Sequence, residues 1–180
     1  MQSRKRIAAG LAGTLVAVGV GVGIGQVLPA SAAPSATPGP VVLGSSSSKF
    51  VRVLKLNEAL RLARAAELAC AKKGFPVTAS VVDTDGVVIA TVRHELATGA
   101  TVQVATAKAT ASAGFKSPTS GLAQGAAKNP GLINIPGFSI LPGGEPIFIK
   151  GQIVGGIGVS GAPSGDIDDS CVAAATSANS

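Results

Sequence analysis

Residues 142–169 have the sequence PGGEPIFIKGQIVGGIGVSGAPSGDIDD, and this stretch decides the fold. Its two β-branched runs, residues 146–149 and 152–159, are separated by Lys150-Gly151, a pair that is typical of a tight hairpin turn. Glycine supplies the positive φ that such turns require. The serine and aspartates at the end of the stretch favour the start of a helix. We therefore predict two antiparallel strands followed by a helix.

The same stretch contains the glycine spacing of a dinucleotide-binding fingerprint, at Gly156, Gly158 and Gly161. That fingerprint places a helix directly after the third glycine, so that a pyrophosphate can bind at the helix N-terminus. Here residues 162–165, APSG, separate the third glycine from any helix, and we do not predict a nucleotide site. Glycines inside a strand also allow a close approach by another element. We expect that element to be another part of the chain or a second subunit.

The other expected elements do not alternate strictly between β and α. They are a helix at residues 55–73, strands at 77–83 and 87–95, helices at 100–115 and 117–127, a strand at 138–141, and a last helix at about 167–178 capped by Ser164 or Asp166. The segment 100–115 also has the period-2 pattern of a strand, but its alanines favour a helix. A doubly wound sheet would alternate β with α. We therefore predict an α+β domain with a five-stranded antiparallel sheet and helices packed on it.

The composition predicts one domain with an aliphatic core. Of the 180 residues, 46% are hydrophobic but only 3% are aromatic, with no Trp and no Tyr. The net charge of +6 includes three basic residues near the N-terminus; without them, 12 basic and 9 acidic residues give +3. The basic residues are scattered and are not interleaved with aromatic ones, which argues against a nucleic-acid partner.

The first 32 residues have the three parts of a signal peptide. A basic SRKR precedes an uncharged run at residues 7–28 and the small-residue site Ala30-Ser31-Ala32. An uncleaved membrane anchor is the alternative, and SRKR is also close to a twin-arginine signal. Residues 33–48 are rich in Pro, Gly and Ser and predict a disordered linker. We expect a secreted or extracytoplasmic protein whose single domain spans residues 49–180.

The motif PGGxPI followed by GxxVGGIGVSGAPSGDxD and a helical cysteine, Cys171, resembles the GlcG/HbpS family of small haem-binding proteins. This family is related to the C-terminal domain of PduO-type proteins. The resemblance extends upstream through VTASVVDTDGVVIATVR and KATASAGFKSPTSGLA and covers roughly residues 54–175. It implies a profilin-like α+β fold, haem binding in some members, and a homo-oligomer, which is an octamer in the family. It supplies no axial ligand residue by residue.

His94 is the only histidine of the chain and the first candidate for a haem ligand. Once the leader is cleaved the chain has no Met and no Tyr, so the usual protein ligands reduce to His94, Cys70 and Cys171. The alternative is an exposed histidine at a strand end. The hydroxyls of Thr98 and Thr101 are second candidates for a ligand. The two cations that could pair with haem propionates are Arg93 and Lys108.

The two cysteines fall on the first and last expected helices. Cysteines of an exported protein often pair, and a bridge between Cys70 and Cys171 would close a loop of about 100 residues. Two buried thiols are the alternative. Asp166, Asp168 and Asp169 could bind a cation, but acids in the first turn of a helix are explained more simply by the helix dipole.

No catalytic residues are proposed from the sequence, because no carboxylate pair or activated nucleophile stands out. This absence favours a binding protein over an enzyme. The first hypothesis is therefore an exported, oligomeric haem-binding protein that sequesters haem or iron and could report redox stress to a membrane sensor protein. A haem-degrading or other small-molecule enzyme and an oligomeric scaffold without a ligand are the alternatives.

Overall fold

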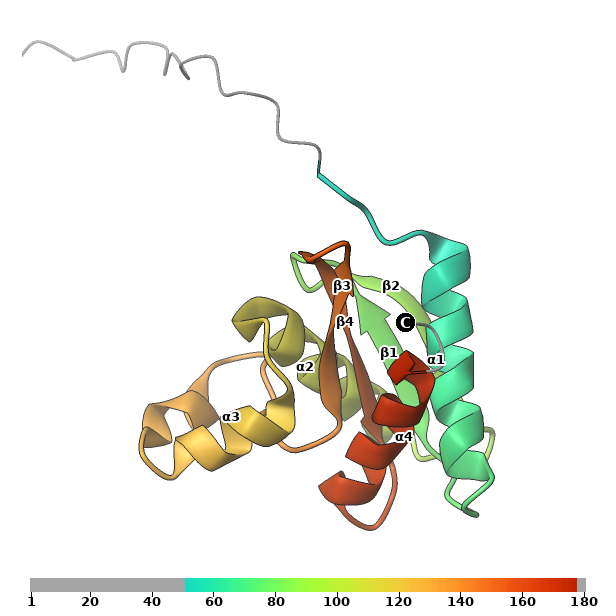
Figure 1. Cartoon of the computed structure of the whole chain (residues 1–180). Helices are drawn as coiled ribbons and strands as arrows, with labels where there is room; N and C mark the ends of the chain where they lie inside the picture. The colour runs from blue at the N-terminus through green and yellow to red at the C-terminus, as the bar shows by residue number, and fades with distance from the viewer. Residues whose placement is uncertain (1–50, 178–180) are drawn as a thin grey trace, which may run out of the picture. The chain divides into compact units, whose positions relative to one another are not determined.

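The computed structural model describes residues 51–177, and the expected signal peptide and linker lie outside these residues (Figure 1). The elements, in chain order, are α1 (Leu56–Ala71), β1 (Thr78–Val82), β2 (Val88–Arg93), α2 (Ala100–Phe115), α3 (Thr119–Ala126), the 3-10 helix η1 (Pro130–Asn134), β3 (Gly144–Ile149), β4 (Gln152–Ser160) and α4 (Gly165–Ser177). The backbone N–H of Ile167 donates to the Ser164 hydroxyl at 3.4 Å, so Ser164 caps α4. No helix within the described residues is long and apolar enough to cross a membrane.

The strands form one antiparallel sheet in the order β2-β1-β4-β3. Helices α1 and α4 cover one face of this sheet, and α2 covers the other face with α3 beside it (Figure 1). The predicted α+β class is confirmed. The hairpin between residues 146–149 and 152–159 is present as β3 and β4, which pair from Gly144 opposite Gly158 to Ile149 opposite Gln152.

The prediction of five strands is wrong, because the described residues contain four. Residues 138–141 do not form a strand and are held by α2 instead. The backbone N–H of Ser139 donates to the carbonyl oxygen of Ala107 at 3.1 Å, and the Phe138 ring meets the Phe115 ring edge-on with centroids 5.7 Å apart. Phe138 and Ser139 therefore contact a helix rather than joining a sheet edge.

The main core lies between the sheet and the α1–α4 layer, and it is aliphatic as predicted. Its largest fully buried side chains are valines and an isoleucine of the central strands, with the two cysteines behind them: Val77, Val81, Val154, Ile157, Val159, Cys70 and Cys171. Alanines such as Ala59, Ala63 and Ala66 face this core from α1. Small side chains on the helix therefore let α1 lie close to the sheet.

Helix α2 packs backbone to backbone on β4, which explains the glycines of that strand. A Cβ atom added at Gly158 would lie 2.1 Å from the carbonyl oxygen of Ala105, and one at Gly156 would lie 2.3 Å from that of Ala109. Any side chain at these positions would push α2 away. The expected close approach is thus made within the chain, and the helical interpretation of residues 100–115 is confirmed.

Candidate functional site

Two of the sequence-predicted residues, His94 and Arg93, lie at the corner where β2 ends and the chain turns towards α2. The backbone N–H of His94 still pairs with the Val77 carbonyl oxygen at 3.0 Å, so the strand alignment fixes the histidine backbone. The backbone N–H of Leu96 donates to Nδ1 of His94 at 3.1 Å. The ring is therefore oriented by the turn that follows it, and its side chain is 22% exposed.

Arg93 braces this corner from the neighbouring position. Its guanidinium donates to the carbonyl oxygen of Ala97 and, at 3.3 and 3.5 Å, to those of His94 and Glu95. The residue is exposed, so its charge also faces solvent. Arg93 can therefore hold the turn that follows His94 while its charge remains open to solvent.

Thr98 and Thr101 lie at the start of α2, on the same corner. The Thr101 hydroxyl donates to the Thr98 carbonyl oxygen at 2.6 Å and shares a second 2.6 Å hydrogen bond with the hydroxyl of Thr78. The Thr98 side chain is exposed. The structure thus brings together four of the five predicted cofactor-binding residues. Thr101 is engaged by the strand beneath it, whereas Thr98 is open to solvent.

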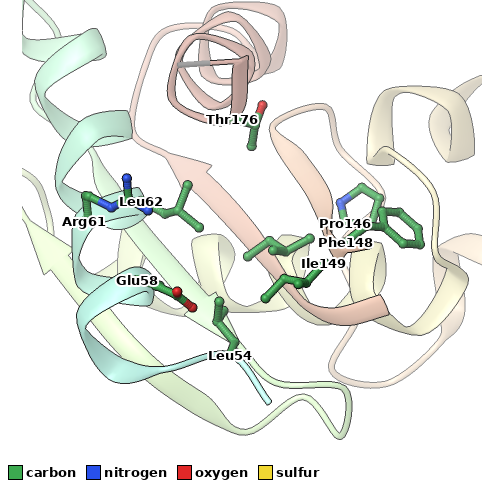
Figure 2. Close-up of a pocket in the computed structure, with 9 residues that line it drawn as sticks. Leu54, Glu58, Arg61, Leu62, Pro146, Phe148, Ile149 and Thr176 are labelled. Carbon is green, nitrogen blue, oxygen red and sulfur yellow. The ribbon is translucent and has the colours of Figure 1, made fainter. Parts of the chain in front are cut away.

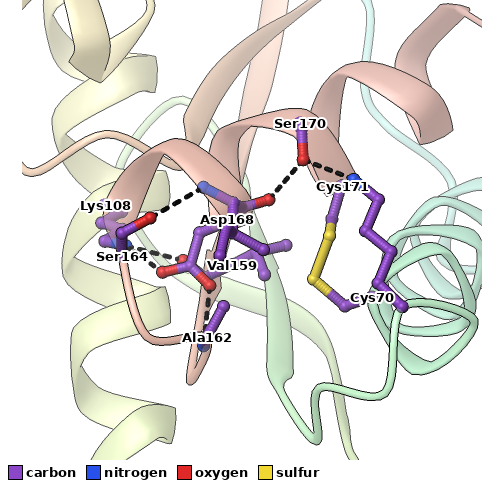
Figure 3. The surroundings of a disulfide bond; sticks show 10 residues. Cys70, Lys108, Val159, Ala162, Ser164, Asp168, Ser170 and Cys171 are labelled. Atoms are coloured by element: carbon purple, nitrogen blue, oxygen red, sulfur yellow. Dashed lines mark hydrogen bonds and ion pairs between the residues drawn. A yellow bond between two sulfur atoms is a disulfide. The ribbon is translucent and has the colours of Figure 1, made fainter.

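Lys108 is separate from this corner and occupies a different environment. Its side chain is 2% exposed, and its ammonium group donates to Asp168 Oδ2 at 2.8 Å and to the Val159 carbonyl oxygen at 2.9 Å (Figure 3). Asp168 in turn accepts a hydrogen bond from Ala162 N–H at 3.1 Å. Lys108 therefore ties α2 to β4 and α4 from the inside, and its burial argues against contact with a propionate.

The PGG motif is explained by this buried pair. Gly143 has φ +116, and a Cβ atom there would lie 2.7 Å from Cβ of Asp168 and 3.0 Å from Nζ of Lys108. The Gly143 N–H also donates to Asp169 Oδ1 at 3.0 Å. Of the three aspartates considered as a cation site, Asp169 thus holds the loop before β3, while Asp168 is used by Lys108 and by the Ala162 N–H after β4. No group of three or more potential metal ligands occurs among residues 51–177.

Burial and nearby charge shift the pKa values of two acids in this region. Burial raises the pKa of Asp168 above its usual range, although the Lys108 ammonium opposes the shift. Burial, and then repulsion by Asp169, raise the pKa of Glu145. Both acids lie where α4 meets the sheet, so they bear on stability rather than on the corner at His94.

Cys70 and Cys171 form a disulfide in the structure, with an S–S distance of 2.08 Å and a Cα–Cα distance of 5.4 Å (Figure 3). The bond joins α1 to α4 inside the core and closes a sequence separation of 101 residues. Sulfur in a disulfide is not available as a thiolate ligand. Of the three conventional haem ligands considered from the sequence, this leaves His94.

The donors at the corner fit the polar contacts of haem. Among residues 51–177, Nε2 of His94 has no hydrogen-bond partner, while Nδ1 is engaged by Leu96 and lies 3.6 Å from Glu95 Oε2. An imidazole that binds iron through Nε2 carries its proton on Nδ1 and commonly donates it to a carboxylate. Glu95 is placed to accept that proton if the ring releases the Leu96 N–H. Leu96, whose backbone N–H bonds to the ring, has an apolar side chain that is 75% exposed.

A groove that the sequence did not predict lies at the opposite end of the sheet (Figure 2). Its volume is about 410 Å³, and it is formed by the start of α1, strand β3 and the end of α4. The lining residues are Leu54, Glu58, Arg61, Leu62, Pro146, Ile147, Phe148, Ile149 and Thr176. None of them is a conventional haem ligand. The sequence carries no signal for this groove, because its lining comes from three separate elements; Phe148 is the large apolar lining residue that stays exposed, at 48%.

Comparison with known proteins assigns the chain to a family. Residues 54–177 match the family model described as haem degrading protein HbpS-like, and the chain belongs to this family. A double mutant of HbpS from Streptomyces reticuli is 38% identical, with a TM-score of 0.72 over 78% of this chain and 97% of that one. A second HbpS structure is 37% identical, with a TM-score of 0.72 over 78% and 99% of the two chains.

A third solved structure is a complex of PduOC with heme. It is 26% identical, with a TM-score of 0.63 over 71% of this chain and 95% of that one. No curated protein matched the chain in sequence. The resemblance to the GlcG/HbpS family is confirmed, and the family description together with the heme complex supports haem binding in general.

Proposed function

We propose that this protein is an exported haem-binding protein that takes haem at the β2–α2 corner, with His94 as the axial ligand. The observation that carries the proposal is the state of the His94 ring. Its backbone N–H bonds to Val77 just before β1, its Nδ1 accepts the Leu96 N–H, and its Nε2 has no partner among the described residues. Haem bound there would supply an iron coordination site and two propionates, which the chain meets with an imidazole and a cation.

Each residue of the corner has a defined part in this proposal. Arg93 keeps the turn in place and offers its charge to a propionate. When the ring releases the Leu96 N–H and carries its proton on Nδ1, Glu95 would accept that proton, which would orient the ring and make Nε2 a better ligand. The Thr98 hydroxyl is the exposed donor at the start of α2 and can contact the ligand edge. Lys108 has no part, because its ammonium group is buried against Asp168.

The proposed location is outside the cytoplasm, where the protein would sequester haem or iron as a homo-oligomer. The disulfide between Cys70 and Cys171 supports this location, because such bonds persist in oxidising compartments. The three-part pattern of residues 1–32 supports it independently. A role in reporting redox stress to a membrane sensor protein rests on the family resemblance.

The test is a haem titration of the purified protein, followed in the Soret band. The proposal predicts saturable binding with one haem at each His94 site. The Soret absorbance of bound haem should be well above that of a control protein without a haem site. Absorbance that rises linearly with haem, as it does for a nonspecific control, would refute it.

Haem degradation is a second candidate function, favoured by the description of the matching family. It is tested by adding a reductant and oxygen to the haem complex. Loss of the Soret band with release of iron over repeated additions of haem would support an enzyme. A Soret band that persists, with haem recovered intact, would support binding alone.

A further inference from the structure

The outer edge of β2 carries backbone groups that have no partner among the described residues. The His94 N–H bonds to the Val77 carbonyl oxygen, and residues pair across β1 and β2 from Thr78 opposite Arg93 onwards. In an antiparallel ladder, hydrogen-bonded and non-hydrogen-bonded pairs alternate. Thr91 and Arg93 therefore point their N–H and C=O groups away from β1, towards the free edge.

The opposite edge of the sheet, β3, is closed in two ways. The Gly144 N–H donates to the Thr119 hydroxyl at 2.8 Å, so α3 covers one outward group. Pro146 lies on the same edge and has no N–H to offer. Natural sheets commonly protect their edges with such devices. Within residues 51–177, β2 is therefore the open edge of the sheet.

The composition of β2 also favours pairing with another strand. Its sequence, VIATVR, is rich in β-branched residues and contains neither Pro nor Gly. Three large apolar side chains remain exposed near its ends: Val87 is 62% exposed, Val88 is 47% exposed and Leu96 is 75% exposed. An antiparallel partner strand would bring the two ends together, because residues near the start of one strand face residues near the end of the other.

We propose that two copies of the chain pair through β2 in antiparallel orientation, with the two-fold axis at Val92. This register places Thr91 of each copy opposite Arg93 of its partner, so that both outward-facing residues form hydrogen-bonded pairs and no like charges stand opposite each other. It also brings the turn after Arg93, which carries Leu96, to the start of the partner's β2 at Val88. The two four-stranded sheets become one continuous sheet of two copies.

This interface completes the corner at His94. In one chain, the apolar Leu96 side chain at this turn is 75% exposed, and a porphyrin requires a wider apolar wall. The partner's Val88 extends that wall on the side of Leu96. Pairing through β2 would give the proposed homo-oligomer a specific interface, and the free backbone groups of β2 support this pairing whether or not haem binds.

Cysteine cross-linking tests the register. Residues directly opposite in a non-hydrogen-bonded pair have Cα atoms about 4.5 Å apart, which is within the range for a disulfide. Val92→Cys should therefore form a covalent dimer on mild oxidation, seen on a non-reducing gel. The matched control is Val88→Cys, whose two copies would lie eight residues apart along the paired strands, or roughly 27 Å. Cross-linking of the control but not of Val92→Cys would overturn the register.

Proline at the outward position tests the interface itself. Thr91→Pro removes an N–H that makes no hydrogen bond within the sheet, so the fold should be kept while pairing is lost. Thr91→Val is the control, because it loses the same hydroxyl contact with Ser80 but keeps the N–H. Light scattering should show dimers or larger assemblies of even number for the wild type and Thr91→Val, and a halved mass for Thr91→Pro.

A monomeric wild type at tens of micromolar, or an unchanged mass in Thr91→Pro, would overturn the pairing. A dimer cross-linked through Val92→Cys that fails to bind haem would leave the pairing intact and refute the proposed function alone.

Discussion

Replacing Lys108 by methionine should destabilise the protein by about 3–5 kcal/mol, the usual cost of removing one partner of a buried ion pair. The side chains of Lys108 and Asp168 are only 2% and 4% exposed, and their charged atoms are 2.8 Å apart. Methionine keeps the length of the lysine but leaves the Asp168 carboxylate without its cation and the Val159 carbonyl oxygen without a donor. The free energy of unfolding is measured by urea denaturation with the disulfide intact.

The double variant Lys108→Met with Asp168→Asn is the control for this prediction. It removes both charges and leaves mainly the Val159 carbonyl oxygen unpaired, which costs about 1–3 kcal/mol. The double variant should therefore be more stable than Lys108→Met alone. A double variant whose loss equals the sum of the two single losses would show that the two groups do not act as a pair.

The loss in Lys108→Met should also depend on pH. Burial raises the pKa of Asp168 in the folded protein, and Lys108 opposes that shift, so removal of Lys108 raises the pKa further. A carboxyl whose pKa is higher in the folded state binds more protons there, and stability falls as pH rises through that pKa. The variant should therefore approach the wild type as pH is lowered from neutral towards the usual range of aspartate. A loss below about 1 kcal/mol, or one that is constant with pH, would refute the reasoning.

Three further predictions concern packing, the disulfide and a second acid. Gly158→Ala should lower the free energy of unfolding by ~3 kcal/mol, because the new Cβ would meet the backbone of α2. The control Gly99→Ala, whose new Cβ would have nothing within 4 Å, should stay within about 0.5 kcal/mol of the wild type. Equal urea midpoints for the two variants would contradict this. Replacing Cys70 and Cys171 by alanine should cost up to ~4.7 kcal/mol, and alkylation of two thiols in the unreduced wild type would rule out the bond. Glu145→Gln should raise the free energy of unfolding at pH 7, because burial and a neighbouring aspartate raise the pKa of Glu145 in the folded state. A gain in stability that persists at a pH below the usual pKa range of glutamate would count against this cause.

The local elements could be predicted from the sequence because their signals are local. Lys150-Gly151 marks the β3–β4 hairpin. The alanines of residues 100–115 favour the helix α2 over the strand that the period-2 pattern also allows. The prediction of a fifth strand was wrong because the deciding contact is not local. Residues 138–141 have a strand-like composition, but what decides their structure is α2, whose Ala107 carbonyl oxygen takes the N–H of Ser139.

The candidate site shows the same division between local and distant contacts. Arg93, His94, Thr98 and Thr101 could be grouped from sequence, because one short connection between a strand and a helix holds them. Lys108 could not be separated from them, because its partner Asp168 lies 60 residues further along the chain. The hydrophobic periodicity of a sequence predicts whether a lysine faces the core or the solvent, but it does not predict which distant carboxylate that lysine contacts.

The central claim is that His94 binds haem, and it is tested most directly by comparing Soret titrations of the wild type, His94→Ala and Thr101→Val. The account predicts saturable binding with the same spectrum for the wild type and Thr101→Val, and a lost or shifted Soret band for His94→Ala. An unchanged spectrum and affinity in His94→Ala, with the change appearing instead in Thr101→Val, would contradict it and transfer the ligand to the start of α2.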